Sequence, residues 1–329
     1  MSLAPTRRAF LAAGTSALAM TFAGRAGAQA KPTLRFSAVF SEQDIRAEMM
    51  KKFADAISAD YTLQSYFGGN LFKQGTELVA MQRGNLEMGN IAPQDVSNQI
   101  PAWSIMTAAY LFRDAEHMTK VFASDVGAEL KKMAEDQLGV RILAPTYFGS
   151  RHVGLRSKKK INTPADLAGV KLRMPGGDAW QFLGQSLGAN PVPMAYPEVY
   201  TGLQTGAIDG QDNPLPNVQN MKFYEVSSQI VLTSHLVGFD LLTVSAKTWN
   251  AMSADKKRAF QAAADAAVGW SNAEHAKKEK ELVDFFKAQG LDVYVPDLAA
   301  FRDFAQKKYL ASDLAKSWPA GMLAKINAL

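Results

Sequence analysis

The sequence predicts an α/β fold in two lobes, with one long helix that runs along both. Strand-like and helix-like segments alternate through residues 33–91, a rhythm typical of a mostly parallel sheet covered by helices. The later predicted strands fall into two groups separated by crossings of the chain. Residues 253–289 contain no proline and one glycine, Gly269, which permits a helix of roughly 50 Å. Two helices broken near Gly269 are the alternative.

Hydrophobic spacing and turn residues define the elements in order. Residues 44–59 place Ile45, Met49, Phe53 and Ile57 four apart, on one face of a helix. The same criteria predict, in the first half of the chain, strand 33–40, helix 44–59, strand 61–66, helix 75–83, strand 86–91, helix 115–137 and strand segments 140–145 and 147–151. In the second half they predict a helix start at 163–167, strand 170–174, strand segments 228–232 and 241–245, helix 253–289, strand 291–295 and a helical tail.

These elements suggest how the chain divides. We expect residues 31–152 and part of 240–329 to form lobe one. Lobe two then comprises residues 153–239, with returns from the C-terminal region. No internal repeat or low-complexity segment interrupts this division.

Residues 1–30 have the pattern of an export signal. Arg7 and Arg8 precede an apolar, alanine-rich stretch, and residues 28–30, Ala-Gln-Ala, offer a small-x-small cleavage site. The adjacent arginines favour the twin-arginine route, and an ordinary Sec signal is the alternative. Either route leads to the periplasm. Cleavage would remove three arginines and no acid, which lowers the formal net charge from +5 to +2.

Composition excludes several classes of protein and site. The 329 residues are 47% hydrophobic and 20% charged, as in an ordinary soluble globular protein. The absence of cysteine excludes disulfide scaffolds and cysteine nucleophiles. The four histidines form no metal-binding pair, and no nucleotide-binding glycine loop or GxSxG elbow occurs. We therefore expect no metal site and no cofactor. No run of lysine and arginine with interleaved aromatic residues occurs, so we expect no nucleic acid partner.

The most informative stretch spans residues 169–214. Its start alternates like a short strand that ends at the Pro-Gly-Gly turn of residues 175–177. Arg173 therefore lies at the carboxyl end of a strand, where open α/β sheets bind ligands. Its guanidinium carries five donors in a fork that matches a carboxylate. A surface arginine in an ordinary ion pair is the alternative interpretation.

This stretch resembles the signature of the DctP-type solute-binding proteins of TRAP transporters. The matching pieces are Lys171-Leu172-Arg173-Met174, Leu187-Gly188-Ala189, Pro191 to Met194, Glu198-Val199-Tyr200, Leu203-Gln204-Thr205-Gly206 and Asp209 to Pro214. The likeness covers about residues 31–329. It implies a periplasmic-binding-protein-like fold with a ligand cleft between two lobes and a long bracing helix. It also implies a periplasmic subunit that delivers a small organic acid anion to TRAP membrane permease subunits and is not an enzyme. We expect a monomer.

The resemblance also implies which residues bind the ligand. Arg173 matches the family's carboxylate-binding arginine, and Asn213 matches a ligand-contacting asparagine in the DGQxNP motif. An Asx turn before Pro214 is the alternative role for Asn213. Arg151 resembles a second family arginine, for which Arg156 is the competing candidate.

Residues near the predicted strand ends complete the candidate site. The aromatic candidates are Tyr196, Trp180, Phe67 and Phe40. The polar candidates are Gln94 and Asp240. An acid at position 240 would accept hydrogen bonds from ligand hydroxyls and repel a second carboxylate. The identity of the ligand stays open. The alternative functions are an exported α/β enzyme and a sensor, each acting on a carboxylated small molecule.

Overall fold

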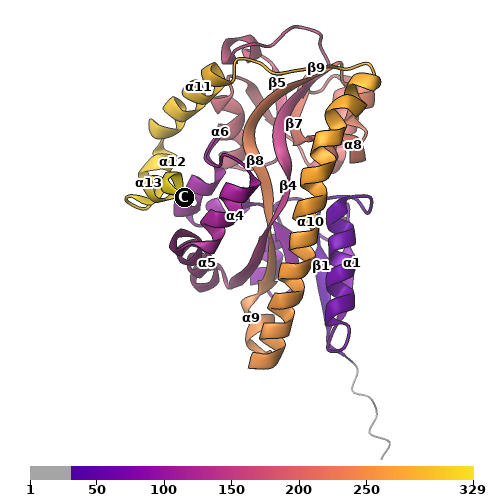
Figure 1. Ribbon diagram of the computed structural model, residues 1–329, viewed down its shortest axis with the longest axis vertical. Coiled ribbons are helices and arrows are strands. Elements are labelled where there is room, and N and C mark those ends of the chain that lie inside the picture. Colours follow the sequence, from indigo (N-terminus) through magenta and orange to yellow (C-terminus); the bar gives the residue numbers. More distant parts are fainter. Residues whose placement is uncertain (1–30) are drawn as a thin grey trace, which may run out of the picture. The chain divides into compact units, whose positions relative to one another are not determined.

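The computed structural model describes residues 31–329, and the fold is that of Pro32–Leu329. The predicted export signal, residues 1–30, lies outside the described residues. As predicted, the described part of the chain has an α/β fold, with nine strands in one sheet. Figure 1 shows how these strands and the surrounding helices are arranged. The strand order is β2-β1-β3-β8-β4-β7-β5-β6, and β9 pairs with β8.

The elements have the following bounds. The strands are β1 Thr33–Ser37, β2 Thr62–Tyr66, β3 Met88–Ile91, β4 Val140–Leu155, β5 Lys171–Met174, β6 Asn190–Pro193, β7 Gly210–Pro214, β8 Gln229–Ser245 and β9 Asp292–Tyr294. The α-helices are α1 Ile45–Ile57, α2 Glu77–Gln82, α3 Pro93–Ser97, α4 Ala115–Ala123, α5 Asp125–Leu138, α6 Asp178–Ser186, α7 Val199–Thr205, α8 Leu215–Asn220, α9 Ala246–Asn250, α10 Ala254–Ala288, α11 Leu298–Leu310, α12 Asp313–Lys316 and α13 Met322–Ala328. The 3₁₀ turns are η1 Pro101–Thr107, η2 Pro164–Leu167, η3 Tyr196–Glu198 and η4 Phe223–Val226.

Two long antiparallel strands, β4 and β8, connect the rest of the sheet. Strands β1, β2 and β3 join through β8, whereas β5, β6 and β7 join through β4. The sequence predicted each long strand as two shorter segments. The strands continue across the intervening residues, and the β4–β8 ladder shifts register beside Gly149, between Tyr147 and Gly149. The predicted lobe boundaries remain a prediction.

The predicted helix over residues 115–137 is in fact two helices. Ser124 is extended, with φ −85° and ψ 177°, and separates α4 from α5. The second helix then folds back against the end of the first. A Cβ at Gly127 would lie 2.4 Å from the carbonyl oxygen of Phe122, so this approach requires glycine. The sequence showed an unbroken apolar period but gave no sign of this close contact.

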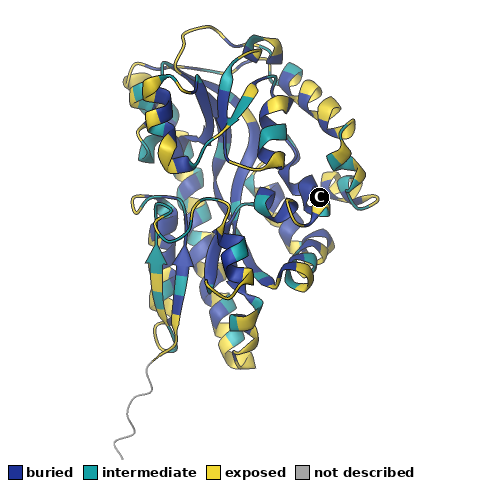
Figure 2. Cartoon of the chain, turned by 180° about the vertical axis from the view of Figure 1, so that it is seen from behind, coloured by how far each residue is buried: buried dark blue, intermediate teal, exposed yellow. Residues whose placement is uncertain are grey.

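The long helix α10 is continuous, as predicted, and passes through Gly269 without a break. Ser253 caps its first turn by accepting a hydrogen bond from the Lys256 N–H. Its first half, including Phe260, packs into a core with α1 and β1, and its second half, including Phe286, packs into a separate core with α7, α8 and β9. The two cores lie at different levels of one 35-residue helix. Figure 2 shows that the buried residues gather on the central strands, whereas the exposed ones lie on the outer faces of the helices.

Polar side chains of α10 also bond to the edge of β4. Along residues 140–150, β8 is the one strand that pairs with β4 in the described part of the chain. On the other edge, Gln261 donates to the Leu143 carbonyl (3.0 Å), Asn272 accepts from the Tyr147 N–H (2.9 Å) and Glu279 accepts from the Ser150 N–H (2.7 Å). The helix thus satisfies backbone groups that a strand would otherwise pair.

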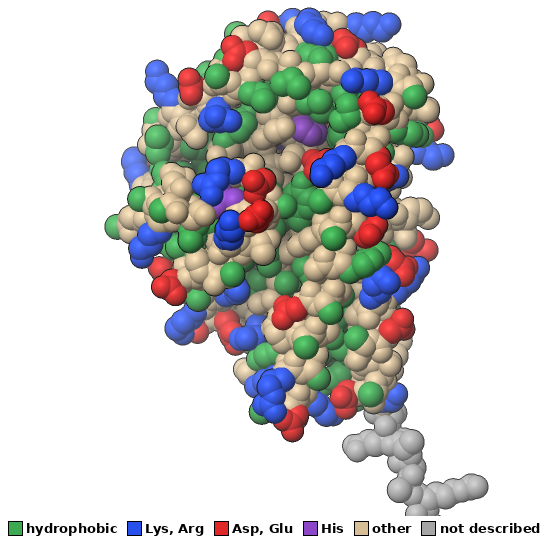
Figure 3. Space-filling model, viewed as in Figure 1, with side chains coloured by type: hydrophobic (Ala, Val, Ile, Leu, Met, Phe, Trp, Pro, Cys, Tyr) green, Lys and Arg blue, Asp and Glu red, His purple; other side chains and the backbone are tan. Residues whose placement is uncertain are grey.

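The outer surface carries mixed charge. Figure 3 shows basic and acidic side chains interspersed along the face that includes α10. Between residues 31 and 329, no helix combines the length and the apolar character needed to cross a membrane.

Candidate functional site

One cavity brings together seven of the nine residues that the sequence predicted. The space between its walls, including solvent at its open side, is about 520 Å³. The predicted residues that line it are Phe40, Arg151, Arg173, Trp180, Tyr196, Asn213 and Asp240. The sequence analysis missed the other side chains that line it: Val39, Arg46, Gln74, Glu77, Asn90, Ala92, Asp95, Phe148, Pro175 and Asn217.

Arg173 lies near the carboxyl end of β5, the strand next to the edge strand β6, and is 1% exposed. Its Nε donates to the Met194 carbonyl (2.8 Å) and its Nη2 to the Oε1 of Gln74 (3.2 Å). No carboxylate is ion-paired with it within the described part of the chain. Burial lowers the pKa of Arg173 to about 9, although Asp212 acts in the opposite direction. The guanidinium therefore stays charged at neutral pH and lacks a counter-ion.

Arg151, on β4, is buried as well, but it is fully paired. Its Nε and Nη2 lie 2.8 Å from the two carboxylate oxygens of Asp212, and its guanidinium stacks over the ring of Trp180. His235 contacts the same carboxylate at 3.1 Å. Burial alone would raise the pKa of Asp212, but Arg151 and His235 hold it well below its usual range. The competing candidate, Arg156, lies away from this cavity, beside Gly206.

Arg46 is a third buried arginine in the cavity wall, and the sequence analysis missed it. It lies in the first turn of α1, where its guanidinium bonds to the N-cap residue Asp44 (2.8 Å) and to Asp240 (2.8 Å). The rings of Phe40 and Phe148 lie over it, at 4.4 and 4.2 Å. In the sequence, an arginine two residues after an N-cap aspartate indicates a helix start, but it does not indicate a side chain that lines a cavity.

Gln74 bridges two walls of the cavity and was also missed. It precedes α2, and its Oε1 accepts from the Tyr196 N–H (2.8 Å) and from Arg173. Gly75, with φ +83°, supplies the left-handed turn that follows it. The glycines of this loop indicated a turn, but they gave no sign that a side chain would reach β5.

Two asparagines line the same cavity. Asn213, on β7, donates to the side chain of Gln211 (2.7 Å) and is almost fully buried, rather than forming a surface turn. Asn217, in α8, is 5% exposed, and its Oδ1 has no hydrogen-bond partner among the described residues. A buried acceptor without a donor is costly, so a ligand donor would be favourable there.

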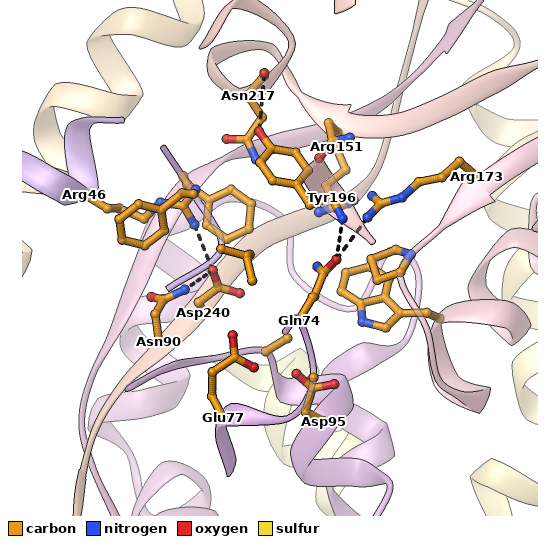
Figure 4. A pocket seen from close by; sticks show the side chains of 18 residues that line it. Arg46, Gln74, Glu77, Asn90, Asp95, Arg151, Arg173, Tyr196, Asn217 and Asp240 are labelled. Carbon is orange, nitrogen blue, oxygen red and sulfur yellow. Dashed lines mark hydrogen bonds and ion pairs between the residues drawn. The ribbon is translucent and has the colours of Figure 1, made fainter. Parts of the chain in front are cut away.

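Two acids line the side of the cavity away from Arg151 and Arg173. Figure 4 shows Glu77 and Asp95 there, with Gln74 between them and the two arginines. Burial raises the pKa of Glu77 to about 8 and that of Asp95 to about 7. The neighbouring charges add to both shifts, because Asp95 acts on Glu77 and Asp240 acts on Asp95.

Phe67 and Gln94 do not line the cavity. The Phe67 ring packs against Phe40, with centroids 5.6 Å apart, and so supports a residue that does. Gln94 is buried in α3, and its Oε1 has no hydrogen-bond partner in the described region. No group of three or more histidine, aspartate or glutamate side chains among residues 31–329 is arranged to hold a metal ion.

Comparison with known proteins identifies the family. The family described as "bacterial extracellular solute-binding protein, family 7", or DctP, matches residues 36–313. The sialic acid-binding periplasmic protein SiaP of Vibrio cholerae is 31% identical over 299 residues, which cover 89% of this chain and 92% of that protein.

Solved structures give the same result. A TRAP periplasmic solute-binding protein from Roseobacter denitrificans, with bound 3-deoxy-D-manno-oct-2-ulosonic acid, is 46% identical, with a TM-score of 0.89 and coverage of 91% of this chain and 99% of that one. A TRAP protein from Polaromonas sp. JS666, bound to D-erythronate, is 28% identical, with a TM-score of 0.84 and coverage of 91% and 99%. These are binding proteins rather than enzymes. The chain thus belongs to the DctP family, the periplasmic solute-binding proteins of TRAP transporters.

Proposed function

We propose that this protein captures a small organic carboxylate through Arg173 and delivers it to a TRAP membrane permease. The observation that carries the proposal is a buried, charged guanidinium that no carboxylate of the described chain neutralises. Leaving such a cation unpaired is costly, and an incoming carboxylate would offset that cost with bidentate, charge-assisted hydrogen bonds. Asn213 and Tyr196 lie in the same wall and would contact the ligand beside Arg173.

We further propose that the ligand is a sugar acid. The Roseobacter relative holds 3-deoxy-D-manno-oct-2-ulosonic acid and the Polaromonas relative holds D-erythronate, both of which carry one carboxylate and several hydroxyls. The cavity wall supports this class, because it offers the side-chain amides of Gln74, Asn90 and Asn217 and the carboxyl group of Asp240. Such groups can accept from and donate to hydroxyls.

Closure around the ligand would follow from contacts made by both walls. Gln74 comes from the predicted lobe one, whereas Arg173 and Tyr196 come from lobe two. A ligand held between these walls favours the state in which they are together. The closed protein would then dock on the permease.

Isothermal titration with 3-deoxy-D-manno-oct-2-ulosonic acid and a panel of aldonates and uronates tests the proposal. We expect at least one acid to bind, and Arg173→Ala to weaken it roughly tenfold to a hundredfold, since charge-assisted hydrogen bonds contribute about 1.5–3 kcal/mol. Arg173→Lys is the matched control: it keeps the charge, loses the fork and should bind with intermediate affinity. Unchanged affinity in Arg173→Ala would refute the role of this arginine.

A further inference from the structure

The cavity has an acidic end whose charges are not compensated. Glu77 begins α2 and is 3% exposed, and Asp95 lies in α3 beside it. Figure 4 shows both carboxyl groups directed into the cavity. Within the described chain, neither forms an ion pair with a lysine, arginine or histidine. Burial and other acids raise the pKa of both carboxyl groups, and hydrogen bonds from backbone N–H groups offset only part of the rise.

A separate observation shows that another part of the cavity wall also lacks a hydrogen-bond donor within residues 31–329, on the side of Tyr196 in Figure 4. The Oδ1 of Asn217 lines the same cavity, is buried and lacks a donor among the described residues. Ionised carboxyl groups and this amide oxygen can only accept hydrogen bonds. A ligand hydroxyl can donate to them, whereas a ligand carboxylate has no hydrogen to give.

The other cations of the wall cannot hold a second carboxylate without losing a partner. Arg46 is paired with Asp44 and Asp240, and Arg151 is paired with Asp212. Arg173 is thus the one cavity-lining arginine without a carboxylate partner in the described part of the chain. A second carboxylate on the ligand would lie where its nearest unpaired neighbours are acids.

We propose that Glu77 and Asp95 determine specificity: they accept the hydroxyls of a monocarboxylate and reject dicarboxylates. The inference rests on the proposed function, in which Arg173 holds the first carboxylate. A hydroxyl can donate to an ionised carboxyl or accept from a protonated one, so it suits either state. A second carboxylate on the ligand can lie beside Glu77 and Asp95 only when these acids are protonated, because like charges at close range repel.

This difference makes the selectivity depend on pH. The charged or titratable groups that share the cavity with the two acids are Arg46, Arg151, Arg173, Tyr196 and Asp240. The pKa values of about 8 for Glu77 and about 7 for Asp95 mean that both acids ionise between roughly pH 6 and 9. Repulsion of a second carboxylate should therefore grow across this range. A ratio of two affinities cancels effects on Arg173, because both ligands use it.

Matched pairs of acids test the inference by titration calorimetry: D-erythronate with meso-tartrate, and galactonate with galactarate. Each pair differs only in whether the terminal carbon is a hydroxymethyl or a carboxylate. At pH 8.5 we expect the monocarboxylate to bind at least tenfold more tightly, and the ratio to narrow severalfold at pH 6. The double variant Glu77→Gln/Asp95→Asn should bring the ratio of the two affinities closer to one at pH 8.5. Asp313→Asn, which removes an exposed acid elsewhere, is the control and should leave the ratio unchanged.

The outcomes separate this inference from the proposed function. Equal or tighter binding of the dicarboxylates at pH 8.5, or a ratio that neither pH nor the double substitution alters, overturns the inference while Arg173-dependent binding stands. If no acid binds, both are overturned. If the double variant does not fold, the pH series on the unaltered protein decides alone.

Discussion

Arg151 and Arg173 line one cavity and are equally hidden from solvent, yet they differ in their counter-ions. Arg151 is held by both oxygens of Asp212, and through them by His235. Arg173 donates to a backbone carbonyl and an amide oxygen, and no carboxylate of residues 31–329 pairs with it. The difference separates an arginine that holds the wall together from one that is available to an anion. Burial alone would not have distinguished them.

The largest expected effect is on stability. Arg151→Met should lower the free energy of unfolding by about 3–5 kcal/mol, because it leaves the buried carboxylate of Asp212 without its cation. Arg173→Met should leave the ligand-free protein as stable or more stable, because it removes a buried charge that lacks a counter-ion. Urea denaturation of both variants without ligand measures the contrast. Equal destabilisation would remove the distinction between the two arginines.

The next largest effect is a loss of stability at acid pH, which arises beside Arg151. His152 follows Arg151 on β4, and burial lowers its pKa to about 3. Between pH 6.5 and about 3 the unfolded chain binds a proton at this residue that the folded chain does not, so stability falls as the pH falls. From pH 7.5 to 5 the loss from His152 should be roughly 2 kcal/mol. In His152→Gln, whose side chain cannot titrate, the free energy of unfolding should fall less steeply between pH 7.5 and 5. An equally steep fall in both proteins would show that His152 is not the source of the loss.

The smallest expected effect concerns the neutral partner of Arg173. Gln74→Ala removes the oxygen shared by Arg173 and the Tyr196 N–H. A net loss of about 0.5–1.5 kcal/mol would weaken ligand binding roughly twofold to tenfold, mainly through faster dissociation. Stopped-flow measurement of ligand release checks this. Gln74→Glu provides a sharper comparison: it gives Arg173 an internal carboxylate and should weaken binding more than Gln74→Ala does.

The sequence predicted most of the elements and the part of the site that lies in one contiguous motif. Arg173 and Asn213 could be identified because their motif is local. Arg46 and Gln74 could not be identified as cavity residues. Arg46 lies in a helix start and Gln74 precedes a glycine turn, and both patterns indicate only local structure. The Arg151–Asp212 pair depends on the register of β4 against β7, which places Val153 opposite Asp212. No periodicity in the chain encodes that alignment.

The break between α4 and α5 has a similar cause. Apolar spacing predicted a single helix over residues 115–137, and that spacing does continue on both sides of Ser124. The turn instead depends on backbone contact between Gly127 and Phe122, which no single-residue preference reveals. In contrast, α10 was predicted correctly because a long stretch without proline, capped by Ser253, leaves few other conformations.

Three side chains of α10 that bond to β4 restrict the length of this part of the chain. Gln261, Asn272 and Glu279 are spaced by 11 and 7 residues, close to three and two helical turns, so they share one face. Their partners on β4 advance by four and three residues, about 13 and 10 Å. Inserting or deleting one residue between Gln261 and Glu279 would turn the later side chains by about 100° away from the strand. Natural variation in this segment should therefore be confined to substitutions, with changes of length found beyond Ala288.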